Sequence, residues 1–209
     1  MSKPYASSSP DRAPGARWRM WAHRAAAALT LSLFGLTLAG GMAMADSADD
    51  RRVRAGARLF RALLAAEVEV ESKAAPDGAL HVVVFGDDKH LMSEVTDLIA
   101  PAGDAANSAI RDLPLQVVSI DTLPDLDKTR PVGIFLATSP TDAQLDALIR
   151  WSANAHVVLY SPFEGHVERG VAAGIAVEAK VQPYLNLTAL REAGIELKPF
   201  FVKVAKVRQ

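Results

Sequence analysis

The chain has 209 residues, of which 50% are hydrophobic and 22% charged, which suits one globular domain and is too short for two ordinary ones. The first 45 residues contain five basic side chains and one acidic side chain, so the remainder holds 18 basic and 23 acidic residues, a formal charge of −5. An acidic body argues against nucleic acid as the main ligand, since phosphate binding needs a basic surface. The absence of cysteine excludes a disulfide framework, a thiolate zinc site and an iron–sulfur cluster.

The first 45 residues have the pattern of an export signal. Residues 1–24 are polar with net positive charge, and residues 25–45 contain no charged side chain. The segment ends in Ala43-Met44-Ala45, which completes the basic region, apolar region and A-x-A cleavage site of a secretory signal peptide. An uncleaved anchor is the alternative, because roughly 20 uncharged residues are enough to span a bilayer. Both interpretations place the body, residues 46–209, in the periplasm.

Helical and strand patterns alternate through most of the body. Helices are predicted at 51–68, at 89–99 and after Pro140-Thr141-Asp142, and strands at 80–85, 115–120, 132–138 and 156–160. Alternation of this kind is typical of a mainly parallel sheet with helices on its faces. We therefore expect a single three-layer α/β domain that follows an N-terminal signal segment.

The C-terminal part departs from this alternation. Two β-like segments, 171–179 and 181–186, precede a short helix at 187–193 that ends at Gly194, and residues 195–207 then alternate apolar and basic side chains. Three glycines in this region are expected to permit turns or a positive φ rather than to line a ligand loop; they are Gly165, Gly170 and Gly174. Four apolar residues near the end are expected in the core; they are Phe200, Phe201, Val202 and Val204.

The most suggestive polar cluster is the pair Asp87 and Asp88, directly after the strand at 80–85. A pair in this place lies at the carboxyl edge of a parallel sheet, where α/β proteins usually bind ligands. Thr138 and Ser139 follow another strand of the same sheet and are expected at the same edge. Capping of the next helix is the favoured role of the aspartates, and contact with a ligand or partner by all four residues is the alternative.

No familiar catalytic motif is present in the sequence. It contains no G-x-S-x-G, P-loop or G-x-G-x-x-G pattern, and its five histidines are scattered without metal-ligand spacing. We therefore expect no metal, no cofactor and no catalysis. A hydrolase whose catalytic residues are far apart in sequence, such as Asp87, Ser139 and His156, is a weaker hypothesis.

Four consecutive segments of the C-terminal third carry a family resemblance. These are a glycine-rich strand at 174–178, an aromatic-hydrophobic-Asn element at 181–187, an alanine-rich helix with an Ala-Gly turn at 189–195, and a hydrophobic run at 200–207. In this order and spacing they resemble the YfiR-like family of periplasmic regulators, and residues 82–88 are similar to its first strand and turn. The chain departs from the family at a Trp-Pro segment and at the family cysteines, which it lacks.

The resemblance implies a non-catalytic function in signal transduction. YfiR-like proteins bind the exported domain of an inner-membrane signalling protein, typically a diguanylate cyclase of cyclic-di-GMP signalling, and change its output. It thus implies a protein partner in the periplasm. With the acidic body and the cleaved leader, we expect no binding of nucleic acid and no stable membrane insertion, and a homodimer is an open alternative. A periplasmic protein that binds or senses a small ligand is the alternative.

Overall fold

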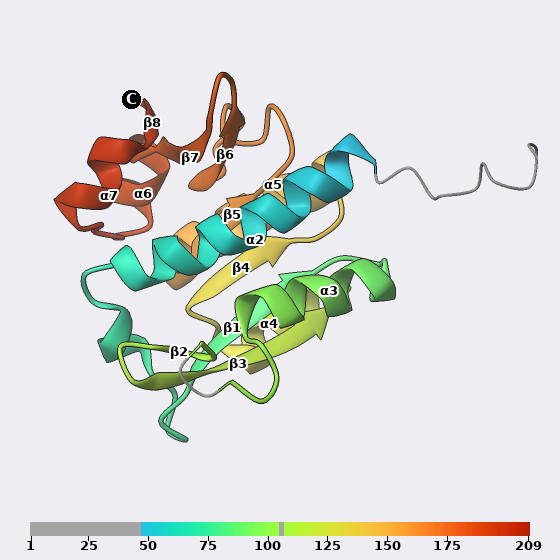
Figure 1. Ribbon diagram of the computed structural model, residues 1–209, viewed down its shortest axis with the longest axis vertical. Helices are drawn as coiled ribbons and strands as arrows, with labels where there is room; N and C mark the ends of the chain where they lie inside the picture. Colours follow the sequence, from blue (N-terminus) through green and yellow to red (C-terminus); the bar gives the residue numbers. More distant parts are fainter. Residues whose placement is uncertain (1–46, 105–106) are drawn as a thin grey trace, which may run out of the picture. The chain divides into compact units, whose positions relative to one another are not determined.

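The computed structural model describes residues 47–104 and 107–209, which form a single α/β domain with an eight-stranded sheet (Figure 1). The signal segment predicted at 1–45 lies outside the described residues. The order of the strands across the sheet is β2-β3-β1-β4-β5-β6-β7-β8. Their bounds are β1 Leu80–Phe85, β2 Ala109–Ile110, β3 Leu113–Ile120, β4 Gly133–Leu136, β5 Val158–Ser161, β6 Ala173–Val177, β7 Val181–Asn186 and β8 Lys206–Arg208.

Five strands in the order β3-β1-β4-β5-β6 are parallel, as the alternation predicts. Strand β2 joins β3 antiparallel at one edge, and β7 joins β6 antiparallel near the other, where β8 pairs in parallel with β7. The chain therefore leaves β1 first toward β3 and later crosses back to β4. Strand β1 lies at the point where the direction of winding reverses.

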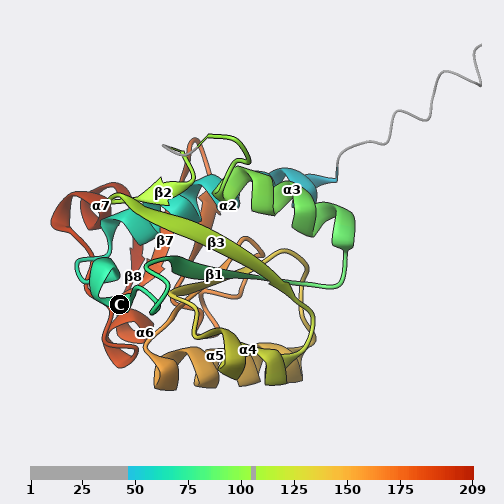
Figure 2. The ribbon, with the colours of Figure 1, turned by 90° about the horizontal axis from the view of Figure 1, so that it is seen from below.

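Helices cover both faces of the sheet and produce three layers (Figure 2). The helices are α2 Ala48–Ala66, α3 Lys89–Ile99, α4 Leu126–Thr129, α5 Asp142–Ala155, α6 Leu187–Glu192 and α7 Pro199–Val204. The side chains of β1 alternate between two cores, with Val82 and Val84 packed beneath α2 and α3, and Val83 and Phe85 facing α4 and α5. Burial on both faces explains why this strand is a continuous apolar run.

The sequence specifies the start of each main helix through a capping residue. Ser47 forms a capping box with Asp50 at the start of α2, and Thr141 forms one with Gln144 at the start of α5. Asp88 accepts hydrogen bonds from two backbone N–H groups in the first turn of α3. Each cap satisfies donors that a helix leaves unpaired, which fixes the starting residue.

Two predictions about the C-terminal half need correction. The strand predicted from His156 begins at Val158, because His156 ends α5 in the left-handed conformation at φ 59°. The segment 195–207, whose sequence shows only an alternation of apolar and basic side chains, contains the helix α7. Gly174 has no positive φ; a Cβ there would approach Ser161 O at 2.5 Å, so close packing of β6 on β5 requires glycine. Gly165 and Gly170 do have positive φ.

Strand β7, helices α6 and α7, and strand β8 form a C-terminal unit at the end of the sheet (Figure 1). The helix α6 begins at Asn186, whose side chain caps it, and ends before Gly194, which has φ 65° as a helix-ending glycine requires. Backbone hydrogen bonds from Val68 N to Glu196 O and from Lys198 N to Ala66 O attach the unit to the end of α2. The position of α7 on the domain is therefore fixed by backbone pairing before it begins.

Candidate functional site

The first candidate site is the carboxyl edge of the parallel strands, where β1, β3 and β4 all end. Ligands of open α/β sheets bind at this edge, usually beside the strand where the winding reverses. In this domain that strand is β1, and the polar residues Asp87, Asp88, Thr138 and Ser139 follow β1 and β4. The structure thus brings the four predicted residues to one edge.

Thr138 lies close to Gly86 and Asp87, where β1 and β4 end. Its hydroxyl oxygen accepts a hydrogen bond from Asp87 N at 3.3 Å. Gly86 is needed beside it, since a Cβ at this position would lie 3.0 Å from Thr138 Oγ1. Asp87 and Thr138, two of the residues predicted to contact a ligand or partner, are therefore hydrogen-bonded to each other.

The remaining two predicted residues have different surroundings. Asp88 caps α3 by accepting from His90 N and Leu91 N at 2.9 and 3.0 Å, which is the favoured role from the sequence. The Asp88 Oδ1 atom is thereby committed to the helix. Ser139 is exposed beyond β4 and does not line the cavity described next.

A cavity of about 430 Å³ lies on the other side of β1, between the ends of β1 and β3 and helix α3. Met92 and Ile120, both buried, provide its apolar surface. Polar groups surround them in a mixed lining; they are Asp87, Lys89, Ser93, Thr96, Ser119 and Asp121. Carboxylates, an ammonium group and hydroxyls around an apolar floor suit reversible binding of a small polar molecule. Sequence reasoning found Asp87 and missed the rest, because β3 was not recognised as the neighbour of β1.

The structure does not bring Asp87, Ser139 and His156 together. Asp87 and Ser139 follow the carboxyl ends of their strands, whereas His156 precedes the amino end of β5, at the opposite edge of the sheet. There its Nδ1 lies 3.0 Å from Ala193 O. The arrangement proposed for a hydrolase is therefore wrong in its geometry.

A serine–histidine pair that the sequence did not suggest occurs after β5. Ser161 Oγ lies 2.8 Å from His166 Nδ1 and also accepts a hydrogen bond from Phe163 N. Burial and the nearby Arg169 lower the pKa of His166, against an opposing effect of Asp142, so the neutral ring is favoured. Ser161 is 0% exposed, which leaves no room for a substrate at its hydroxyl. The pair closes the turn between β5 and β6.

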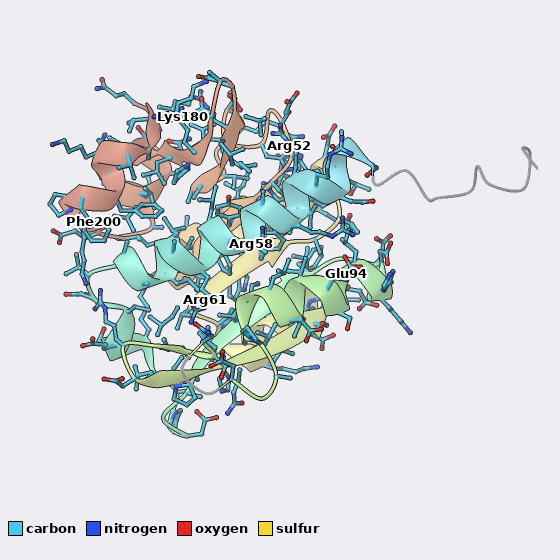
Figure 3. The ribbon with its side chains drawn as sticks, viewed as in Figure 1. Arg52, Arg58, Arg61, Glu94, Lys180 and Phe200 are labelled. Atoms are coloured by element: carbon cyan, nitrogen blue, oxygen red, sulfur yellow. The ribbon has the colours of Figure 1, made fainter. Side chains whose placement is uncertain are left out.

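The second candidate site is on α7, where neighbouring residues differ sharply in exposure. Phe201 is 5% exposed and belongs to the core, as predicted, whereas Phe200 and Val204 are 63% and 56% exposed. Figure 3 shows Phe200 on α7, directed away from the domain. The prediction that these apolar residues all belong to the core is wrong for Phe200 and Val204. Phe200 and Phe201 are the same residue type, so the sequence at these positions does not indicate which of them is exposed.

Two further features bear on ligands and membranes. Over residues 47–104 and 107–209, no group of three or more His, Asp or Glu side chains could hold a metal ion. Over the same ranges, no helix combines the length and the apolar character needed to cross a bilayer.

Comparison with known proteins gives no family for this chain. No protein-family model matches it, and no curated protein matches it. A solved structure of the ABC domain from Streptococcus pneumonia, in complex with L-Trp, is 12% identical, with a TM-score of 0.49 over 73% of this chain and 62% of that one. A conserved domain protein from Vibrio cholerae is 13% identical, with a TM-score of 0.47 over 68% of this chain and 58% of that one. The chain spans about three fifths of both proteins. Sequence identities and TM-scores this low support no inference about the ligand of this chain. The resemblance to the YfiR-like family stays a prediction.

Proposed function

We propose that this protein is a non-catalytic periplasmic regulator. In this proposal the body binds the exported domain of an inner-membrane signalling protein of the diguanylate cyclase type and changes its cytoplasmic output. Such regulation requires only that the body binds one state of its partner more tightly than another. The family is YfiR-like, and the leader delivers the body to the periplasm.

One observation carries the proposal. Three of the four segments that resemble the YfiR-like family, within 181–207, coincide with the C-terminal unit, and this unit exposes a phenylalanine and a valine on α7. Exposed aromatic side chains are characteristic of protein interfaces, where they act as anchors in a partner's pocket. The resemblance and the exposed apolar side chains therefore point to one activity, the binding of another protein.

Deletion of the gene and two kinds of complementation test the proposal. We expect the deletion to raise cyclic diguanylate and surface attachment, and the full chain to restore both. A version that lacks residues 1–45 should fail to restore them, because it would remain on the wrong side of the membrane. Full rescue by this leaderless version would refute the model, since the contact would then have to be cytoplasmic.

A second candidate function, binding of a small ligand, is favoured by the 430 Å³ cavity beside β1. A panel of small polar metabolites should then include one that raises the melting temperature of the purified protein. Ser93→Phe, which fills the cavity from α3, should abolish that shift. Ser139→Phe is the matched control, because Ser139 is exposed at the same edge outside the cavity. If no metabolite shifts the melting temperature, this function is rejected.

A further inference from the structure

The two most exposed large apolar side chains in the described part of the domain are neighbours on α7. Phe200 is 63% and Val204 56% exposed, and four positions separate them, which places both on one side of the helix. Lys203 is exposed and shares that side, three positions from Phe200. Lys198, immediately before α7, is partly exposed. We call these four residues the α7 surface.

The α7 surface is basic, although the body is acidic. Residues 198–209 contain four basic side chains and no acidic one, whereas the body as a whole has a formal charge of −5. Lys206 pairs with Glu178 at 2.8 Å, and Arg208 donates to the carbonyl oxygens of Val167 and Glu168. Across the described ranges, Lys198 and Lys203 form no ion pair. Their charges are therefore available to a partner.

Charge and apolar area decide between the three kinds of occupant that an apolar surface admits. A second copy would bring the same lysines together, and like charges in an interface oppose association. A membrane would gain little from α7, because its six residues present only two exposed large apolar side chains. A protein with an apolar pocket and carboxylates at its rim matches both the Phe200 ring and the lysines.

We infer that the α7 surface docks on an acidic protein surface, with Phe200 inserted in an apolar pocket and Lys203 facing carboxylates at its rim. This inference rests on the proposed function, for which it specifies the binding face and the chemistry of the partner. Phe200 contributes the apolar anchor. The two lysines contribute orientation and rate of association, which salt weakens.

Photo-crosslinking in intact cells tests this inference with the full chain. The probe is p-benzoyl-phenylalanine in place of Val204, and the control is the same residue in place of Val118, which is 37% exposed on β3 near the opposite edge of the sheet. We expect a crosslink from position 204 to the exported domain of one membrane protein, through a peptide rich in Asp and Glu. Phe200→Ala or Lys203→Glu should lower its yield by about tenfold or more. Unchanged melting temperatures of both variants show that their folds are intact.

Each other outcome contradicts a defined part of the reasoning. A crosslink from position 204 to a second copy or to lipid, or no crosslink from it, overturns the α7 surface as a protein-docking site. A crosslink to a signalling protein from position 118 alone overturns the choice of surface but leaves the proposed function standing. If the gene deletion also leaves cyclic diguanylate unchanged, the proposed function fails as well.

Discussion

Replacement of Tyr160 by phenylalanine should stabilise the protein. Tyr160 lies in β5 beneath α2, with its ring stacked on Phe135 at 5.5 Å between centroids and tilted against Phe60 at 5.5 Å. Its side chain is buried, and within the described ranges its hydroxyl oxygen has no hydrogen-bond partner. Burial raises the pKa of Tyr160 far above its usual value, against an opposing effect of Arg52. The hydroxyl therefore stays neutral and unpaired in an apolar core.

The size of the effect follows from two opposing contributions. Burial of an unpaired hydroxyl costs about 1 to 3 kcal/mol, which Tyr160→Phe would recover. The missing oxygen leaves a small void, and each lost atomic contact costs only about 0.1 to 0.2 kcal/mol. We expect the free energy of unfolding to increase by about 1 kcal/mol, which raises the melting temperature by roughly 2 to 4 °C.

Denaturant and thermal unfolding of the purified variants measure this change. Tyr184→Phe is the matched control, because burial and then an interaction with Glu168 raise the pKa of Tyr184, and its hydroxyl has a polar neighbour. That variant should gain no stability. If Tyr160→Phe instead loses about 1 kcal/mol, the hydroxyl has a bound partner such as a buried water, and the reasoning is refuted.

Three further predictions concern the helix end, the pH dependence of stability and the leader. Gly194→Val should lower the free energy of unfolding by about 1 kcal/mol or more, because φ is 65° there, whereas Gly194→Asn should lose less; equal melting of Gly194→Val and wild type would contradict this. Burial raises the pKa of Glu67 despite Lys73 and Arg111, so its stabilising contribution is greatest when protonated and is lost as pH rises through the folded pKa. As the pH falls from neutral toward the ordinary glutamate pKa of about 4.3, wild type should therefore gain stability relative to Glu67→Gln. A difference in urea unfolding that is constant with pH would exclude the effect. The mature protein should begin at Asp46, and sequencing of the periplasmic form decides this against an intact membrane-bound chain.

The sequence predicted those elements whose boundaries depend on adjacent residues. The bounds 80–85 and 89–99 agree with β1 and α3, because an apolar run, a glycine and the cap Asp88 all lie within a few positions of each other. The cavity beside β1 depends on the pairing of β1 with β3 across the sheet. No local sequence pattern specifies the order of the strands in the sheet. For this reason Asp121, which lines the cavity, was not among the predicted residues.

His156 and Ser161 show the same limit for chemistry. Serines, histidines and aspartates that are far apart in a sequence can be grouped into many hypothetical catalytic triads. The direction of each strand then decides which combinations meet. Because β4 and β5 are parallel, a residue before β5 cannot approach one after β4. The contact between Ser161 and His166 depends on a turn with two positive-φ glycines nearby, whose path the sequence does not specify.

The conformation of residues 199–204 decides whether the α7 surface exists. In a strand, the alternation of apolar and basic residues in this segment would place Phe200, Val202 and Val204 on one side and Lys203 on the other. Pro199 instead begins a helix, a position where its missing N–H is no disadvantage. A helix places Lys203 beside Phe200 and turns Phe201 into the core. An anchor and a cation on the same side are what an acidic partner would recognise, and a strand would have separated them.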